Sequence, residues 1–212
     1  MEGIAFRYFE IEHGGKPNAV NKGLQESNGD YITVLDADDQ LPPSSVSSRL
    51  KPMLKNSADL CIGSFETQYR ENFQMLRSVK GLIHKSRDQL IRVLIGNVIS
   101  PFHQNAMLFH RDLVERTGMM DPAMVRGQDK DYAICLIKHA DQIVFVEDSV
   151  YIYNRYDRPF KKRISNRCTG MKYHLKVAGD HLSVWRKVVY FPWILLVEFA
   201  KLIHDLFGIY KK

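Results

Sequence analysis

The sequence is poor in cysteine, and its start carries no apolar segment. The 212 residues include three cysteines, Cys61, Cys135 and Cys168, and none of them belongs to a Cys-x-x-Cys pair. Neither a disulfide framework nor a zinc knuckle is therefore indicated, and a reducing cytoplasm is the simplest location. The segment from Met1 to Glu12 contains three glutamates and no apolar run, so we expect no signal peptide.

A long apolar run is also lacking. Val188 to Val197 is apolar throughout, but a membrane-spanning helix needs about 20 such residues. With Tyr190, Trp193 and basic flanks, the segment fits an interfacial amphipathic helix, which would place the protein peripherally at the cytoplasmic face of a membrane. A helix packed on the domain or on a partner subunit fits the spacing equally well.

The composition is that of a folded globular protein. Hydrophobic residues make up 45% and charged residues 25% of the chain, which argues against wholesale disorder. The length suits one main domain, and we find neither an internal repeat nor a low-complexity linker. The formal net charge of +6 favours an anionic partner, which could be nucleic acid, a phosphorylated substrate or a membrane surface.

The order of the expected elements indicates an α/β fold. A strand at Ile4–Ile11, a helix at Asn18–Ser27 and a buried strand at Tyr31–Leu35 form a strand–helix–strand unit. The later elements are a helix with Val46, Leu50 and Leu54 on one face, a strand at Leu60–Phe65, a helix opened by the Ser86–Gln89 capping box, helices at Arg111–Thr117 and Asp131–His139, and strands at Ile143–Val146 and Val150–Tyr153.

Three carboxylates follow the strand that ends at Leu35. Asp36, Asp38 and Asp39 lie at the carboxyl end of this strand, where open α/β sheets bind ligands. Carboxylates held this close repel one another unless a hard cation such as Mg²⁺ or Mn²⁺ neutralises them. A solvated acidic loop is the alternative, but the buried strand before the triplet and the prolines after it favour a site.

Several segments in a fixed order resemble family 2 glycosyltransferases with the GT-A fold. They are Gly14–Leu24, Gly29–Ile32, Leu35–Asp39, Asn97–Pro101 with Met107 and Arg111, Thr117–Pro122, and Gly127–Tyr132 in place of the family's Glu-Asp motif. The resemblance implies a mixed, mostly parallel sheet flanked by helices, over residues 1–180, followed at 181–212 by a C-terminal amphipathic helix that could associate with a membrane.

The resemblance also implies roles for individual residues. Asp36 and Asp38 would form the Asp-x-Asp pair, with Asp38 binding Mn²⁺ or Mg²⁺ and Asp36 supporting the ribose or the metal. Lys16 and Asn21 would lie near the nucleotide, and Asp129 would be the general base of an inverting transfer. Supporting positions would be Asp39, Gln128 and Asp131. From the residues alone, a role in capping their helix or complementing its dipole is favoured for Asp129 and Asp131.

Two features depart from the family pattern. Gln128 stands where the family usually has Glu, which removes a charge beside the expected base. The family's first strand and its acidic second strand have no counterpart before Gly14, so we expect a fold that lacks its first strands and leaves a sheet edge unpaired.

The function that we expect is transfer of a sugar from a nucleotide-sugar donor, UDP-linked by preference. The acceptor would be a saccharide or a lipid-linked molecule in the synthesis of a cell-surface polysaccharide or glycan. The alternative is an inactive, truncated remnant that acts as a binding or assembly module. The basic run from Arg155 to Arg167 could clamp a diphosphate or be a solvated loop. Because no nucleic-acid motif is present, we expect no nucleic-acid partner.

Overall fold

The structure is a computed structural model that describes residues 5–69, 73–97, 100–155 and 160–206. Its strands are β1 (Tyr31–Ile32), β2 (Leu60–Tyr69), β3 (Phe73–Arg77), β4 (Met107–His110) and β5 (Ile143–Arg155). Its helices are α1 (Gly15–Glu26), α2 (Ser45–Asn56), α3 (Arg87–Gly96), α4 (Arg111–Thr117), α5 (Gln128–His139), α6 (Phe160–His181) and α7 (Val184–Leu206), with short 3-10 turns η1 (Lys80–Leu82) and η2 (Gln104–Ala106).

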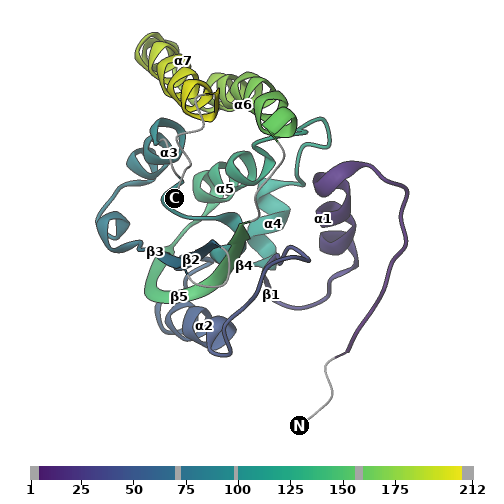
Figure 1. Ribbon diagram of the computed structural model, residues 1–212. Helices are drawn as coiled ribbons and strands as arrows, with labels where there is room; N and C mark the ends of the chain where they lie inside the picture. The colour runs from purple at the N-terminus through teal and green to yellow at the C-terminus, as the bar shows by residue number, and fades with distance from the viewer. Residues whose placement is uncertain (1–4, 70–72, 98–99, 156–159, 207–212) are drawn as a thin grey trace.

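The five strands form one mixed sheet with helices on both faces. The order is β1-β4-β2-β3, and β5 pairs with β2. Figure 1 shows α2 on one face and α3, α4 and α5 on the other, with α6 and α7 stacked beyond them. This three-layer arrangement confirms the expected α/β fold.

Both faces of the sheet are buried. On the side of α5 the larger core includes Leu60, Ile62 and Phe109, and on the side of α2 a smaller core includes Met53, Cys61 and Tyr151. Alternate residues of β2 therefore enter different cores, as the pleat of a strand requires. The two cores fix the sheet between its helical layers.

The pairing of the strands is mostly antiparallel, so the expected predominance of parallel pairs is wrong for the described residues. Among the pairs, β1–β4, β2–β3 and β2–β4 are antiparallel, and β2–β5 is parallel. Because β2 and β3 are close neighbours in the sequence, they pair as an antiparallel hairpin, whereas the long connection from β2 to β5, which contains α3, β4, α4 and α5, allows β5 to run parallel to β2.

The strands expected at Ile143–Val146 and Val150–Tyr153 form one strand, β5, and the two earliest expected strands also differ from the structure. Residues 5–14 form no strand, and Arg7 instead donates a hydrogen bond to the carbonyl of Glu26 while Lys22 lies 5.2 Å from the ring centre of Phe9. The segment thus runs beside α1 (Figure 1). The strand expected at Tyr31–Leu35 is paired only over Tyr31–Ile32, where its residues lie opposite His110 and Phe109 of β4.

Helix α2 runs through Pro52, but it buries a different face from the expected one. Val46 and Leu54 are 47% and 60% exposed, and the buried residues of α2 are Ser45, Arg49 and Met53. The reason is that Arg49 points inward and donates hydrogen bonds to the Met107 carbonyl at 2.6 Å and to the Thr33 hydroxyl at 2.9 Å.

The remaining helices agree well with the sequence. Ser86 and Gln89 form the expected capping box at the start of α3, and α4 has the expected bounds. The last two helices, α6 and α7, pack on each other, and α7 also touches α3. None of the described helices is long and apolar enough to cross a membrane. The division at residues 180 and 181 stays a prediction.

Candidate active site

The acidic loop after β1 meets the first turns of two helices. Lys16, in the first turn of α1, extends its ammonium between two carboxylates. Its Nζ lies 2.8 Å from Asp36 Oδ2 and 2.7 Å from Asp129 Oδ1. Asp129 stands in the first turn of α5. One lysine therefore contacts both the acidic loop and the expected base, which are more than ninety residues apart in the sequence.

The electrostatics of Lys16 favour the charged form. Burial alone would lower the pKa of Lys16, but the charges and hydrogen bonds of Asp129 and Asp36 outweigh it and raise the pKa above its ordinary value. The ammonium therefore stays protonated at neutral pH and offsets part of the negative charge at this site.

Asp39 is held in place by β5. Its side chain is buried and accepts hydrogen bonds from the Tyr151 hydroxyl and, at 2.8 Å, from the backbone N–H of Asn154. The Asn154 amide donates in turn to the carbonyl of Asp38 at 2.6 Å. Burial raises the pKa of Asp39, although both hydrogen bonds oppose this shift. Asp39 thus anchors the loop.

Asp38 has a different environment from its two neighbours. It is exposed, and its carboxylate makes no hydrogen bond or ion pair with the described residues. Since Asp36 is engaged by Lys16 and Asp39 by Tyr151, Asp38 is the carboxylate of the triplet that is open to an added cation. An open carboxylate beside a second one fits the oxygen ligands that Mg²⁺ or Mn²⁺ prefers.

His103 lies on the other side of Asp129, and the sequence did not single it out for a role. Its Nε2 is 3.9 Å from Asp129 Oδ2, and its ring stacks on Tyr151 and Tyr153 with centroid distances of 5.3 and 5.7 Å. Burial lowers the pKa of His103, against the opposing charge of Asp129. The ring is therefore neutral at neutral pH. No local motif marks it, because its partners are distant in sequence.

Other expected site residues lie apart from this cluster. The side-chain amide of Asn21 exchanges two 2.9 Å hydrogen bonds with the backbone of Met120. Gln128 begins α5 and makes no side-chain hydrogen bond with the described residues. Asp131 accepts from His181 Nε2 at 2.7 Å. The nucleotide role of Asn21 and the supporting roles of Gln128 and Asp131 stay predictions.

Asp131 also belongs to a group of metal-binding residue types. The ligand atoms of Asp131, Cys135 and His181 lie within 4.8 Å of one another. The group joins α5 to the end of α6, and its sulfur and nitrogen donors suit softer metals than the carboxylates of the acidic loop do. Of the basic run after β5, residues 156–159 and the side chains of 160–164 lie outside the described part.

A cavity opens beside Lys16 and Asp36. It has a volume of about 420 Å³, lies between α1 and the β1 segment, and is lined by Val20, Leu24 and Val34 among others. This volume is within the range of small-molecule sites. Among the described residues β1 pairs only with β4, so the cavity lies along an open sheet edge.

The sequence matches a known family. The model of the family "Glycosyl transferase family 2" matches residues 2–118, and the chain belongs to this family. An uncharacterized glycosyltransferase of Rickettsia felis is 26% identical over 77% of this chain and 27% of its own length. The glycosyltransferase GlyG of Streptococcus pneumoniae is 22% identical over 67% and 49%, respectively. The chain thus spans less than half the length of these relatives.

Solved structures share the fold. Residues 1–349 of S. aureus TarS, in complex with UDP-GlcNAc, give a TM-score of 0.59 at 12% identity, over 96% of this chain and 58% of that one. The mannosyltransferase PcManGT of Pyrobaculum calidifontis, in complex with GDP-Man and Mn²⁺, gives 0.55 at 19% identity, over 94% and 56%. These likenesses confirm the GT-A type of fold.

Proposed function

We propose that this chain carries the donor and base sites of an inverting glycosyltransferase. The sugar would pass from a nucleotide diphosphate, UDP by preference, to a hydroxyl of a saccharide or of a lipid-linked acceptor. The observation that carries the proposal is the Lys16 bridge between Asp36 and Asp129. It brings the acidic loop and the expected base around one ammonium, so donor and acceptor groups would meet there.

The bridge suggests how donor binding prepares the base. In the absence of donor, Lys16 pairs with both Asp36 and Asp129 and offsets part of their charge. A bound diphosphate would offer Lys16 a stronger anionic partner, and Asp129 would then be free to take the proton of the acceptor hydroxyl. His103, neutral and next to Asp129, would help to position that hydroxyl without adding charge.

The metal-binding role falls to Asp38 with Asp36. A divalent metal, when bound, would stabilise the charge that develops on the leaving diphosphate. Asp38 presents its carboxylate to solvent, and the Asp39 anchor keeps its loop fixed on β5. The Mn²⁺ in the PcManGT complex and the UDP-GlcNAc in the TarS complex support a metal and a nucleotide-sugar donor of this kind.

The acceptor side is proposed from the fold and the family. Synthesis of a cell-surface polysaccharide or glycan, at the cytoplasmic face of a membrane, would suit an enzyme with an apolar helix such as α7. The inactive-remnant alternative draws support from Gln128 and from the cavity along the open edge of β1. A remnant of this kind would bind a partner through that edge.

An exchange of Asp129 tests the proposal. With Mn²⁺ present, release of UDP from UDP-GlcNAc and of GDP from GDP-mannose is measured for the wild type and for Asp129→Asn. We expect the substitution to lower kcat about a hundredfold or more and to leave nucleotide affinity nearly unchanged. Asp112→Asn is the control, because Asp112 also stands in the first turn of a helix. Equal turnover by Asp129→Asn and the wild type would refute the base role.

A further inference from the structure

Helix α7 presents a wide apolar face to solvent. Its exposed large residues, called here the α7 stripe, are Val184, Trp185, Val188, Val189, Trp193, Leu195, Leu196, Phe199 and Ile203. Their spacing places them on one side of a helix, and no charged residue stands among them. Exposure reaches 85% at Trp185 and 61% at Leu196. Soluble monomers rarely expose an apolar surface of this length, so the stripe requires a partner.

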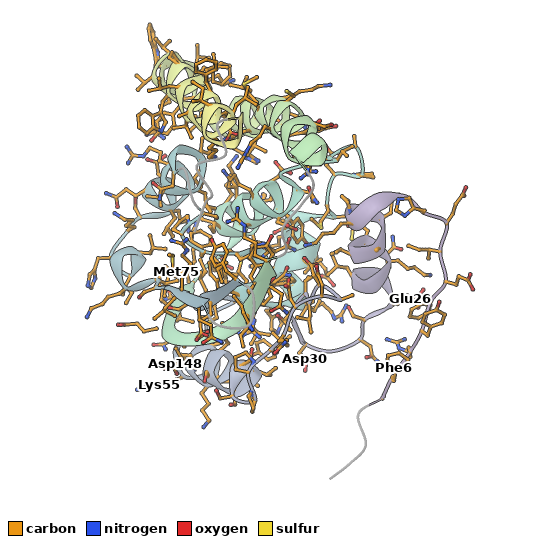
Figure 2. The ribbon with its side chains drawn as sticks, in the orientation of Figure 1. Phe6, Glu26, Asp30, Lys55, Met75 and Asp148 are labelled. Carbon is orange, nitrogen blue, oxygen red and sulfur yellow. The ribbon has the colours of Figure 1, made fainter. Side chains whose placement is uncertain are left out.

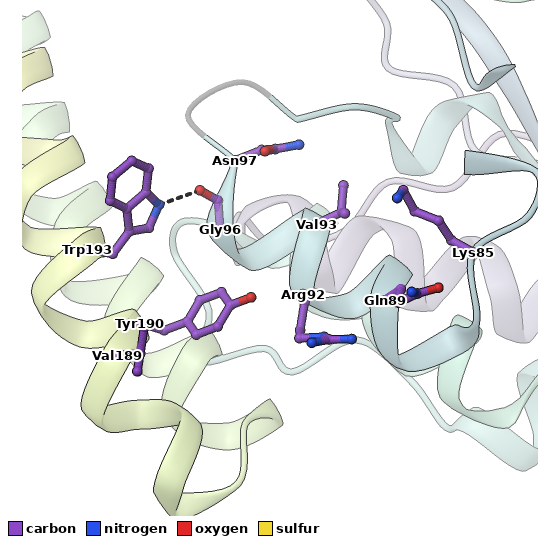
Figure 3. Close-up of a pocket in the computed structure, with 9 residues that line it drawn as sticks. All are labelled: Lys85, Gln89, Arg92, Val93, Gly96, Asn97, Val189, Tyr190 and Trp193. Carbon is purple, nitrogen blue, oxygen red and sulfur yellow. Dashed lines mark hydrogen bonds between the residues drawn. The ribbon is translucent and has the colours of Figure 1, made fainter. Parts of the chain in front are cut away.

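A groove lies along one edge of the stripe. It runs between α3 and α7 with a volume of about 460 Å³, and Lys85, Arg92, Val189, Tyr190 and Trp193 are among its lining residues (Figure 3). The Trp193 indole donates a 2.7 Å hydrogen bond to the carbonyl of Gly96 at the end of α3. This bond fixes the ring at the border between the groove and the stripe. Val189 and Trp193 belong to both surfaces.

The groove carries an excess of positive charge. Arg92 and Arg186 both pair with the carboxylate of Asp88, Arg92 at 3.2 Å. The Lys85 ammonium makes no ion pair or hydrogen bond with the described residues. At this edge of the stripe two guanidiniums therefore share one carboxylate, and the Lys85 ammonium has no counter-charge among the described residues. An anionic group that enters the groove would meet one unpaired ammonium and one guanidinium.

We propose that the groove binds the phosphate headgroup of an anionic lipid while the α7 stripe lies in the membrane interface. An apolar helix face next to cationic side chains and bordered by tryptophan is the pattern of an interfacial helix. The stripe would enter the acyl boundary, and Lys85 and Arg92 would then stand at the level of the phosphates. The anionic surface would add an attraction for each of these cations.

A second copy of the chain is a less suitable occupant. Two stripes packed across a two-fold axis would bring identical surfaces together, and with them the grooves lined by Lys85 and Arg92. Cations of both copies would then face one another at short range, which disfavours the pairing. A surface of phosphates covers the same apolar area and neutralises the same charges.

The inference depends on the membrane location proposed above, but not on the transfer chemistry. Flotation of the purified chain with vesicles tests it, using phosphatidylcholine alone or mixed with phosphatidylglycerol. We expect the wild type to bind the mixed vesicles best. Leu196→Glu should weaken binding at least about tenfold, and Lys85→Gln should weaken it about fivefold, on the anionic vesicles only.

Helix α2, at the opposite end of the molecule, offers matched controls (Figures 1 and 2). Leu54 is 60% exposed, so Leu54→Glu makes the same change as Leu196→Glu on a surface of the same exposure. Lys55→Gln removes the same charge as Lys85→Gln. Both α2 variants should float like the wild type, and UDP binding should be the same in all four variants, which separates this test from that of the donor site.

Two outcomes would overturn the proposal. The first is a wild type that stays unbound with both kinds of vesicle, whether light scattering then finds a monomer or a dimer that Leu196→Glu dissociates. The second is an equal loss of anionic-vesicle binding in Lys85→Gln and Lys55→Gln, since the groove would then contribute no more than net charge.

Discussion

Three aspartates within four residues receive three different environments from the fold. Asp36 pairs with Lys16, Asp38 faces solvent, and Asp39 is buried against Tyr151. The sequence predicted a site at these carboxylates from a buried strand expected before them; that strand ends at Ile32 and Leu35 is exposed, and the site stays a prediction. It could not distribute their roles, since Tyr151 follows Asp39 by 112 residues.

The anchor of Asp39 should matter for stability. Tyr151→Phe removes the hydroxyl that donates to Asp39 and accepts from the Asn105 amide at 3.2 Å. Because it leaves buried polar groups unpaired, we expect a loss of about 1 to 3 kcal/mol in the free energy of unfolding, measured by urea denaturation. The Tyr31 hydroxyl makes no hydrogen bond with the described residues. The free energy of unfolding of Tyr31→Phe should therefore stay within about 0.5 kcal/mol of that of the wild type. Equal values for the two variants would contradict the anchor.

At the scale of elements, sequence signals were reliable where an element depends only on residues close to it in the sequence. The Ser86–Gln89 capping box and the glycine after α4 need only neighbours in sequence, and both appear as expected. The length of a strand depends on partner strands from elsewhere in the chain. In β1, only Tyr31 and Ile32 pair with β4. Residues 5–14 include strand-like side chains but pair with none of the described strands.

The inward face of α2 depends on one buried arginine that hydrophobic spacing could not identify. Arg49 is fully buried, its pKa falls to about 10 through burial, and its guanidinium ties α2 to β4 through the Met107 carbonyl. The face of α2 that contains Arg49 is therefore buried, and Leu54 is exposed to solvent.

We expect Arg49→Ala to lower the free energy of unfolding by about 2 to 4 kcal/mol, because it leaves a cavity and an unpaired carbonyl. Arg49→Met, which keeps most of the volume, should lose less. Lys51→Ala, at an exposed position on the same helix, should stay within about 0.5 kcal/mol of the wild type. Chemical denaturation of the three variants measures this. A small effect of Arg49→Ala would mean that α2 is held by its apolar residues alone.

At the scale of the whole molecule, a buried polar network joins the α6–α7 pair to the sheet domain. His174 of α6 lies 3.2 Å from Glu198 of α7 through Nδ1 and 2.8 Å from the Ile95 carbonyl of α3 through Nε2. Lys201 donates to Glu198 at 2.7 Å. The family resemblance predicted the α/β class correctly, but it could not predict this network, which depends on side chains from α6 and α7 and on a backbone carbonyl of α3.

The network should make stability depend on acidic pH. Burial alone would raise the pKa of Glu198, but His174 and Lys201 lower it from 4.5 to about 2. A lowered carboxyl pKa stabilises the fold above the unfolded value, so this contribution is present above pH 4.5 and is lost as the pH falls towards 2.

Glu198→Gln should remove this contribution, on the order of 3 kcal/mol at neutral pH, and flatten the dependence of Tm on pH below about pH 5. Thermal unfolding across that range measures both effects. Glu115→Gln, at an exposed position on α4, should follow the wild-type curve. A Glu198→Gln curve that runs parallel to the wild type would contradict the proposed network.

The central claim, a metal-dependent donor site at the acidic loop, is tested most directly by calorimetric titration of UDP into the chain with and without Mn²⁺. The account predicts binding that requires Mn²⁺, is lost in Asp38→Ala and persists in Asp148→Ala, which removes an exposed carboxylate of β5 that makes no hydrogen bond or ion pair with the described residues (Figure 2). A folded wild type that binds no UDP with Mn²⁺, or an Asp38→Ala variant that binds as well as the wild type, would contradict it.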